Sequence, residues 1–256
     1  MSQKIVSLTT DFGIADYFVA DLKASILSQY TGVQIVDVSH QIASHDIMQA
    51  AYYLQNVRKS FPTGTIHIVA VYNYYEPVSK FVAFEREGQY YLGPNNGVFS
   101  LVFDDIDPTQ VREIDFGSDM SLTQIYSNAV ALINNDIPLE DIGPVIDDFR
   151  TKLPISPVIT QDQIRATVLH IDHYNNAVIN ITKGQFERIR AGRSLEIYYK
   201  QTDPIRRISK HYGEVAVGEV LALFDSTGYM VIAINMDRAS DQLNLIKNET
   251  IQINFK

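Results

Sequence analysis

The sequence predicts an α/β protein with two domains, and two patterns lead to that prediction. In residues 1–152, short apolar runs alternate with stretches whose apolar side chains recur at helical spacing, which is typical of a largely parallel sheet covered by helices. In residues 158–256, β-rich runs follow one another without a long helical pattern, which indicates a smaller all-β domain, a barrel or a sandwich. A chain of 256 residues, 46% of them apolar, is long enough for two cores.

The elements expected in the N-terminal domain bring two polar residues to one edge of the sheet. Asp11 follows the first apolar run, and Tyr72 ends the third. Because the carboxyl ends of parallel strands meet at one edge, where α/β proteins bind ligands, Asp11 and Tyr72 should lie close together. The expected elements are a strand over 5–8, a helix over 17–29, a strand over 33–38, a helix over about 46–59, a turn over 61–64 and a strand over 66–72.

The segment 149–158 separates the two patterns. It holds two prolines and shows no helical periodicity, so we expect an extended linker there. The predicted domains are therefore 1–152 and 158–256, and a ligand site should draw on both. The β-rich runs of the second domain are 164–171, 177–181, 194–199, 220–224, 229–235 and 250–255.

Composition and charge exclude several classes of function. A net charge of −9, a sequence pI near 5.1 and the lack of a Lys and Arg run argue against nucleic-acid partners and anionic membranes. No apolar run approaches the roughly 20 residues that span a bilayer. The chain has no Cys, which removes disulfides and thiolate metal sites, and its first residues lack the apolar stretch of a signal peptide. We expect a cytoplasmic enzyme with a small-molecule substrate.

Eight short motifs are spread along nearly the whole chain. They are LTTDFG at 8–13, DYFV at 16–19, DVSH at 37–40, AA at 50–51, FPTGTIH at 61–67, GPNNG at 93–97, DHYNN at 172–176 and STGYMVIA at 226–233. Their order and spacing resemble the family that attacks S-adenosyl-L-methionine (SAM) with hydroxide or halide, which includes the hydroxide adenosyltransferases, fluorinases and chlorinases. The tripeptide DFG also occurs in kinases, but the Gly-rich and His-Arg-Asp loops that a kinase needs before it are absent.

The resemblance implies a fold, an assembly and a ligand. The implied fold is an N-terminal mostly parallel sheet sandwiched by helices, with a smaller C-terminal β-barrel domain. The implied assembly is a homotrimer, in which each site lies between the first domain of one subunit and the second domain of its neighbour. SAM is the implied substrate, and neither a metal nor a redox cofactor is implied, because its sulfonium is already an excellent leaving group.

The matching positions imply substrate contacts. Asp11 would accept hydrogen bonds from the ribose hydroxyls, and Asn176 would offer a donor and an acceptor to the adenine edge. The other implied substrate-binding positions are Asp172 and Ser226 for the methionine end, Tyr174 in the same motif as Asp172, and backbone groups near Ile234 and Met236 for adenine. Each carboxylate has a structural alternative, since Asp11 could cap a turn and Asp172 could shape a hairpin.

The positions at which the family handles its nucleophile differ in this chain. Tyr72 stands where the hydrolytic members carry Asp, and Ser79 or Lys80 stands where they carry Arg. A later loop that should hold His reads Ile-Tyr-Ser-Asn at 125–128. Tyr72 and the Tyr126-Ser127 pair resemble the halogenase version of the pocket instead. The candidate catalytic residues are Tyr72, Lys80 and Ser127.

Each of these candidates also has a purely structural interpretation. Tyr72 could be an ordinary half-buried aromatic, although an aromatic face also attracts a sulfonium cation, and Lys80 could be a solvated surface charge. His170 and His173 point to opposite faces of a strand and lack an evident third ligand, so we expect no metal site. His45 precedes a predicted helix, and it is a reserve candidate for the general base.

Three functions follow from these observations. The sequence predicts an enzyme that cleaves SAM at the ribose 5′ carbon, with water or hydroxide, giving adenosine and L-methionine. The alternatives are a halide-using adenosyl transferase, and a non-catalytic adenosyl-binding protein that has lost the family's Asp, Arg and His. Hydrolysis ranks first because it is the commoner activity that the family resemblance implies and because water is always present.

Overall fold

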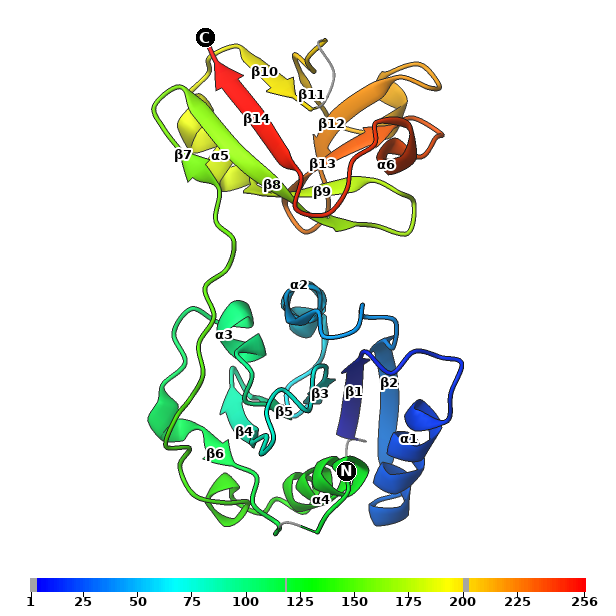
Figure 1. Cartoon of the computed structure of the whole chain (residues 1–256), viewed down its shortest axis with the longest axis vertical. Coiled ribbons are helices and arrows are strands. Elements are labelled where there is room, and N and C mark those ends of the chain that lie inside the picture. The colour runs from blue at the N-terminus through cyan, green and yellow to red at the C-terminus, as the bar shows by residue number, and fades with distance from the viewer. Residues whose placement is uncertain (1–3, 118, 200–202) are drawn as a thin grey trace. The chain divides into compact units, whose positions relative to one another are not determined.

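The computed structural model describes residues 4–117, 119–199 and 203–256. The chain divides into two units, Met1–Pro154 and Ile155–Lys256, and each is described by itself (Figure 1). The division falls within the segment 149–158, where the sequence places the linker.

A six-stranded sheet forms the centre of the N-terminal unit, in the order β2-β1-β3-β5-β4-β6. The first four strands of this order run parallel to their neighbours, and β4 and β6 add an antiparallel edge. The sheet is therefore mostly parallel, as predicted. The strands are β1 (Lys4–Thr10), β2 (Val33–Ser39), β3 (Ile66–Ala70), β4 (Phe81–Arg86), β5 (Gln89–Pro94) and β6 (Arg112–Glu113).

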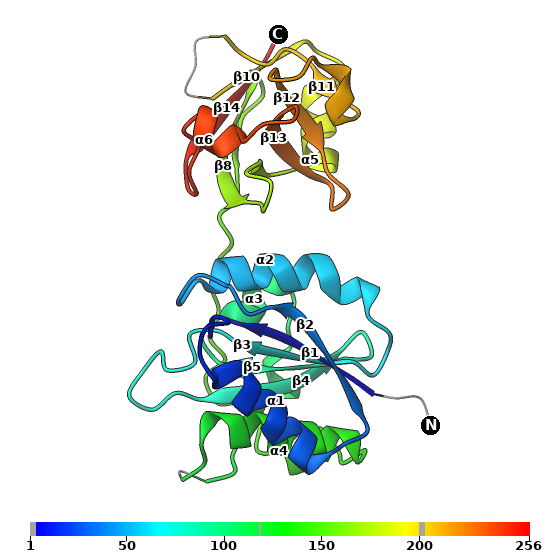
Figure 2. The same ribbon diagram turned by 90° about the vertical axis from the view of Figure 1, so that its right-hand side faces the viewer.

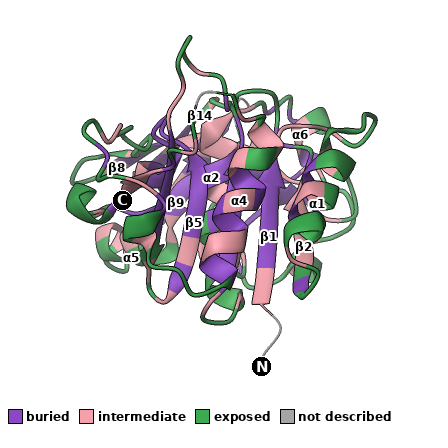
Figure 3. Ribbon diagram, turned by 90° about the horizontal axis from the view of Figure 1, so that it is seen from below, coloured by how far each residue is buried: buried purple, intermediate pink, exposed green. Residues whose placement is uncertain are grey.

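Helices cover both faces of this sheet, which confirms the predicted sandwich (Figure 2). Ile68 belongs to the core beneath α1 and α4, whereas its neighbour Val69 belongs to the core beneath α2 and α3, because successive strand residues point to opposite faces. Every residue of β3 is buried, and Figure 3 shows β1 buried along most of its length. The helices are α1 (Phe18–Gln29), α2 (Ile47–Val57), α3 (Val98–Val102) and α4 (Leu122–Asn134), and the 3-10 turns are η1 (Arg58–Ser60), η2 (Pro108–Gln110) and η3 (Leu139–Asp141).

A helix takes the place of the loop predicted at residues 125–128, which lie in α4. Ser121 begins α4 with a capping box, since its hydroxyl accepts from the Gln124 N–H and its own N–H donates to the Gln124 side chain. Buried Tyr126 and Ile133 lie two helical turns apart on the face towards the sheet. The predicted loop was wrong because it followed the family pattern and overlooked these local helix signals.

The C-terminal unit is a curled sheet that forms half a barrel, in the order β10-β14-β8-β9-β13-β12-β11, with β7 paired to β8. This confirms the predicted fold class of the second domain. The strands pair antiparallel except for β11 and β12, which are parallel. They are β7 (Val158–Ile159), β8 (Gln163–Ile171), β9 (Ala177–Thr182), β10 (Leu195–Tyr198), β11 (Ile208–Ser209), β12 (Val220–Phe224), β13 (Tyr229–Ile234) and β14 (Thr250–Phe255).

The C-terminal unit also contains helices, so the prediction of an all-β domain was incomplete. Thr182 and Gln185 form a capping box at the start of α5 (Lys183–Arg190), and Phe186 of this helix is fully buried in the core of the unit. A helix of two turns is too short for its periodicity to stand out in the sequence. The shorter helical segments are η4 (Tyr212–Glu214) and α6 (Ala239–Gln242).

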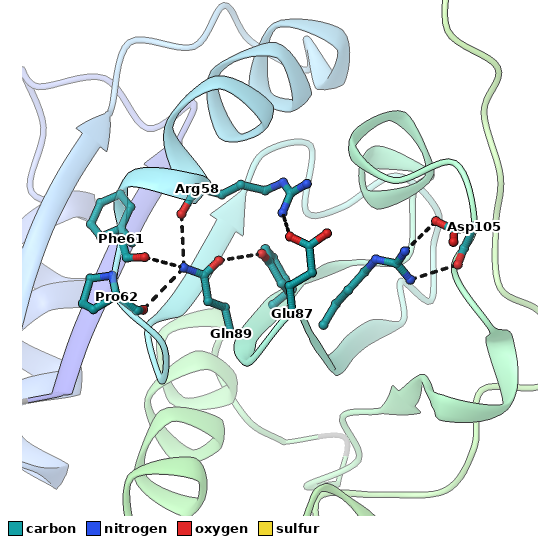
Figure 4. Close-up of polar contacts among 8 residues, drawn as sticks. Arg58, Phe61, Pro62, Glu87, Gln89 and Asp105 are labelled. Carbon is teal, nitrogen blue, oxygen red and sulfur yellow. Dashed lines mark hydrogen bonds and ion pairs between the residues drawn. The ribbon is translucent and has the colours of Figure 1, made fainter.

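Gln89 organises the amino-terminal ends of β3 and β5 (Figure 4). Its Nε2 donates to the backbone carbonyls of Arg58, Phe61 and Pro62, at 3.1, 2.9 and 3.4 Å. Its Oε1 accepts from the buried Tyr91 hydroxyl at 2.9 Å. These bonds satisfy buried polar groups at the end of the sheet opposite to Asp11 and Tyr72.

His67 lies in the same region, fully buried in β3. Its Nδ1 is 2.6 Å from the Ser7 hydroxyl, and its ring stacks on Tyr91 with 5.1 Å between centroids. Burial lowers the pKa of His67 to about 4, and the charge of Arg58 lowers it further, whereas the neighbouring Gln89 side chain opposes this shift. His67 is therefore neutral at physiological pH.

Candidate functional site

A pocket of about 520 Å³ lies at the carboxyl edge of the N-terminal sheet. Asp11 follows β1, and Tyr72 lies just after β3, its parallel neighbour, so both residues reach this edge as the sequence predicts. The loop before α1 and the first turn of that helix, the loop before α2, the segment after β3 and the start of α4 supply the rest of the wall. The lining residues are Asp11, Phe12, Tyr17, Phe18, Asp21, Ser44, His45, Tyr72, Asn73, Tyr74, Ser121, Leu122 and Thr123.

The Asp11 carboxylate holds two loops together. Its Oδ2 accepts hydrogen bonds from the backbone N–H of His45 at 3.0 Å and from that of Tyr72 at 3.1 Å. The turn-capping role considered for Asp11 is therefore present. Among the described residues, its Oδ1 has no hydrogen-bond partner, so one oxygen remains as an acceptor for a ligand.

The two residues bonded to Asp11 both have left-handed backbone conformations. The φ angle is 66° at His45 and 52° at Tyr72, a region that costs a residue other than Gly roughly 1 kcal/mol or more. Their rings meet edge to face, with 4.9 Å between centroids. The shared carboxylate thus supports a strained arrangement, and residues strained in this way cluster at functional sites.

Asn73 is a pocket residue that the sequence reasoning did not name. It is buried, and its Oδ1 accepts from the Tyr126 hydroxyl of α4 at 2.7 Å. Burial raises the pKa of Tyr126 well above its ordinary value, helped by the charges of Asp11 and Tyr74, so Tyr126 remains a neutral donor. The signal that could have found Asn73 is its position directly after the strand-tip residue Tyr72.

Lys80 and Ser127 do not line this pocket. The Lys80 Nζ lies 2.8 Å from Asp147 Oδ1 and 2.9 Å from Glu113 Oε2, and these hydrogen bonds raise the pKa of Lys80. Ser127 is fully buried, and its hydroxyl accepts from the Ser25 hydroxyl of α1 at 2.9 Å. Both residues therefore have partners in the structure of the N-terminal unit, and their catalytic roles stay predictions.

A second pocket, of about 890 Å³, lies in the C-terminal unit. It is formed by the β8–β9 turn, the segment after β13 and a residue of η4. Four of the predicted substrate-binding residues line it, namely Tyr174, Asn176, Ile234 and Met236. The lining residues are His173, Tyr174, Asn175, Asn176, Tyr212, Ile234, Asn235, Met236, Asp237 and Arg238.

Asp172 and Asn176 bind each other across the β8–β9 turn. Asp172 Oδ1 accepts from the Asn176 backbone N–H at 2.8 Å, and its Oδ2 accepts from Asn176 Nδ2 at 2.9 Å. Asn176 lines the pocket and is buried, whereas Asp172 stands behind it. The Asp172 carboxylate thus orients the Asn176 amide, which is the hairpin role that the sequence left open for this pair.

The other predicted substrate positions divide into two groups. Tyr174, Ile234 and Met236 line the C-terminal pocket, and Met236 is 85% exposed with a left-handed φ of 61°. Ser226 does not line it and lies in the β12–β13 turn, at the opposite end of β13 from Ile234. Arg238 is a lining residue that the sequence reasoning missed.

His173 lines the C-terminal pocket, with its ring edge-on to Tyr174 at 5.7 Å between centroids. Within residues 4–117, 119–199 and 203–256, no three His, Asp or Glu side chains gather as metal ligands would. In the same ranges, no helix has the length and apolar character needed to cross a membrane.

Both halves of the chain match models of a single family. Residues 6–143 match the SAM hydroxide adenosyltransferase N-terminal domain, and residues 166–252 match the corresponding C-terminal domain. The chain belongs to the SAM hydroxide adenosyltransferase family. The resemblance seen in the ordered motifs is thereby confirmed.

Similar proteins within this family carry two kinds of name. A protein of Salinispora tropica and one of Methanocaldococcus jannaschii are both named (R)-S-adenosyl-L-methionine hydrolase. The first is 26% identical to this chain over 97% of each protein, and the second is 27% identical over 97% of this chain and 95% of its own length. A protein of Nocardia brasiliensis named fluorinase is 24% identical over 97% of this chain and 96% of its own.

A solved structure of similar fold comes from Thermotoga maritima, where the protein is described as an uncharacterized conserved protein. Its TM-score is 0.85 at 23% identity, and the match covers 98% of this chain and 99% of that one. At this level of identity the comparison supports the fold alone.

Proposed function

We propose that this protein hydrolyses SAM at the ribose 5′ carbon and releases adenosine and L-methionine. The observation that carries the proposal is the Asp11 carboxylate, which lines a pocket at the carboxyl edge of a parallel sheet and keeps Oδ1 as a spare acceptor. A carboxylate oxygen in that position suits the hydroxyls of a ribose. The hydrolase names of the similar proteins support the same reaction.

The chemistry needs little beyond alignment and partial removal of water. The sulfonium leaves as the neutral thioether of methionine, so catalysis consists mainly in holding water in line with the breaking bond. Tyr17, Phe18 and Tyr72 surround the pocket with aromatic rings, which attract a cationic sulfonium. We propose that SAM is the substrate and that no further cofactor takes part.

Adenine recognition is proposed for the C-terminal pocket. The Asn176 amide is held by Asp172, and an amide offers both a donor and an acceptor to a purine edge. Tyr174 is 76% exposed beside it, which leaves a ring face for a flat base. These features support the substrate roles that the family resemblance implies for Asn176 and Tyr174.

We further propose a homotrimer, in which a pocket of one copy and the other pocket of a second copy hold the same ligand. Exposed rings at both pockets support association, since Tyr17 and Tyr174 are 70% and 76% exposed. Light scattering on the purified protein tests the assembly, and a monomer that still binds adenosine would contradict it. A cytoplasmic location is proposed as well, which the cysteine-free sequence fits.

One assay tests the proposed reaction. The purified protein is incubated with SAM, with and without chloride, and the products are separated by chromatography. We expect adenosine and L-methionine in equal amounts under both conditions. Formation of 5′-chloro-5′-deoxyadenosine would assign the halide reaction instead, and unreacted SAM with measurable adenosine binding would indicate a non-catalytic binding protein.

A further inference from the structure

His45 occupies an unusual place in the N-terminal pocket. It lies in the loop between β2 and α2, with a left-handed φ of 66°, and its N–H donates to Asp11 Oδ2 at 3.0 Å. Because that oxygen belongs to the carboxylate proposed to hold the ribose, His45 is anchored next to the sugar. Its ring lines the pocket and meets Tyr72 edge to face at 4.9 Å between centroids.

The imidazole of His45 is available for chemistry. The residue is exposed, and among the described residues neither ring nitrogen has a hydrogen-bond partner. The adjacent Asp46 caps α2, since its Oδ1 accepts from the Gln49 N–H at 3.0 Å. A ring nitrogen of His45 is therefore free to accept a proton from a bound water.

The other titratable groups of the pocket are less suited to this task. Asp11 uses Oδ2 for two backbone N–H groups, and Asp21 is a carboxylate, a weaker base than imidazole. Tyrosine hydroxyls ordinarily titrate near pH 10 and remain protonated at neutral pH. The titratable side chains that line the pocket with His45 are Asp11, Asp21, Tyr17, Tyr72 and Tyr74.

We infer that His45 is the general base that takes a proton from the attacking water. In this step the water oxygen forms a bond to C5′, and the C5′–S bond breaks with its electron pair passing to sulfur. One water proton passes to a ring nitrogen of His45 and from there to solvent, so that adenosine, methionine and a proton are released. The inference rests on the proposed hydrolysis and deepens it.

Three variants of His45 and one of Asp21 test the inference. Asn tolerates the left-handed backbone at position 45 without titrating, so H45N removes the base and keeps the loop. H45G relaxes the same backbone and leaves space for added imidazole. H45F keeps an aromatic ring against Tyr72, D21N removes the second carboxylate of the pocket lining, and H211N, at an exposed histidine outside both pocket linings, is the matched control.

We expect H45N and H45F to lower kcat by about 100-fold, the lower end of the contribution of a general base. In the wild type kcat should fall at low pH, which is the acidic limb of its pH profile, and this fall should vanish in both variants. Adenosine affinity should stay within about 2-fold of wild type. Added imidazole should restore H45G by about 10-fold or more, and H211N should keep the wild-type rate and profile. Asp21 lines the pocket, so D21N is judged only by its acidic limb, which should persist whatever the change in rate.

Several results would overturn the inference. Wild-type turnover with an unchanged rate and profile in H45N removes His45 from the reaction and leaves the proposed hydrolysis intact. A rate loss that imidazole does not rescue, with a parallel loss of adenosine binding, gives His45 a structural role. An acidic limb that disappears in D21N transfers the role to Asp21. Wild-type protein that forms no adenosine from SAM contradicts the proposed function itself, and with it the step assigned to His45.

Discussion

Asp11 offers a test that separates ligand binding from loop structure. Its Oδ2 accepts from the His45 and Tyr72 backbone N–H groups, and within the described part of the chain its Oδ1 has no hydrogen-bond partner. Asp11→Ala removes both oxygens. Asp11→Asn keeps one amide oxygen for the two N–H groups and places an NH₂ group, which donates and does not accept, on the ligand side.

The expected magnitudes follow from these contacts. Loss of a hydrogen bond to a charged acceptor should weaken adenosine binding by about 1.5–3 kcal/mol in Asp11→Ala, or roughly 10- to 150-fold. The loss should be about 1.5 kcal/mol in Asp11→Asn, where a neutral bond replaces a charge-assisted one. Because Asp11 is half-exposed and water can replace its contacts, the two lost loop bonds should lower the free energy of unfolding of Asp11→Ala by only about 1–2 kcal/mol.

Calorimetry with adenosine and urea unfolding measure the two effects on the same samples. Affinity should fall in both variants, whereas the free energy of unfolding should fall clearly only in Asp11→Ala. An Asp11→Asn variant that binds adenosine as tightly as the wild type would refute the ribose contact. Asp11 would then be a residue that only joins the two loops.

Three other predictions concern His67, Tyr72 and Asp172. The pKa of His67 is lowered from 6.5 to about 4, so its contribution to stability is complete above pH 6.5 and is lost as the pH falls towards 4. The free energy of unfolding should fall by ~3 kcal/mol over this range, because each pH unit contributes about 1.36 kcal/mol. Urea unfolding at pH 7 and 4.5 should therefore show a smaller decrease in His67→Gln than in the wild type. Equal decreases in the two proteins would contradict this. Tyr72→Phe keeps the ring against His45 but loses the hydroxyl, so single-turnover rates should change more than adenosine affinity, and a pure affinity change would argue against a role near the nucleophile. Asp172→Ala releases the Asn176 amide, and calorimetry should show adenosine binding weaker by about 1 kcal/mol; wild-type affinity would show that Asn176 needs no support from Asp172.

The sequence by itself determined the alternating strands and helices of residues 5–72 and the edge of the sheet that carries the site. Apolar runs with a strand pattern and stretches with helical spacing are set by neighbouring residues, so the alternation in the N-terminal half was readable along the chain. Parallel strands that end in polar residues place those residues at one edge whatever the details of packing, which is why Asp11 and Tyr72 could be brought together in advance.

Only the tertiary structure decided how the candidate side chains are used. Ser127 lies on the face of α4 that meets Ser25 of α1, and Lys80 lies between Asp147 and Glu113, partners 67 and 33 residues away in the sequence. Such contacts depend on how whole elements pack, which the periodicity of one segment does not encode.

The position of His45 in the pocket also depends on the tertiary structure. Its loop is held by the carboxylate of Asp11, 34 residues earlier in the chain, in a left-handed backbone conformation that is uncommon for residues other than Gly. The hydrogen bond that holds this conformation joins residues 34 positions apart, so it forms only in the folded chain. The sequence could place a histidine beside a predicted helix, but only the folded sheet brings its ring to the pocket with Tyr72 and Asp11.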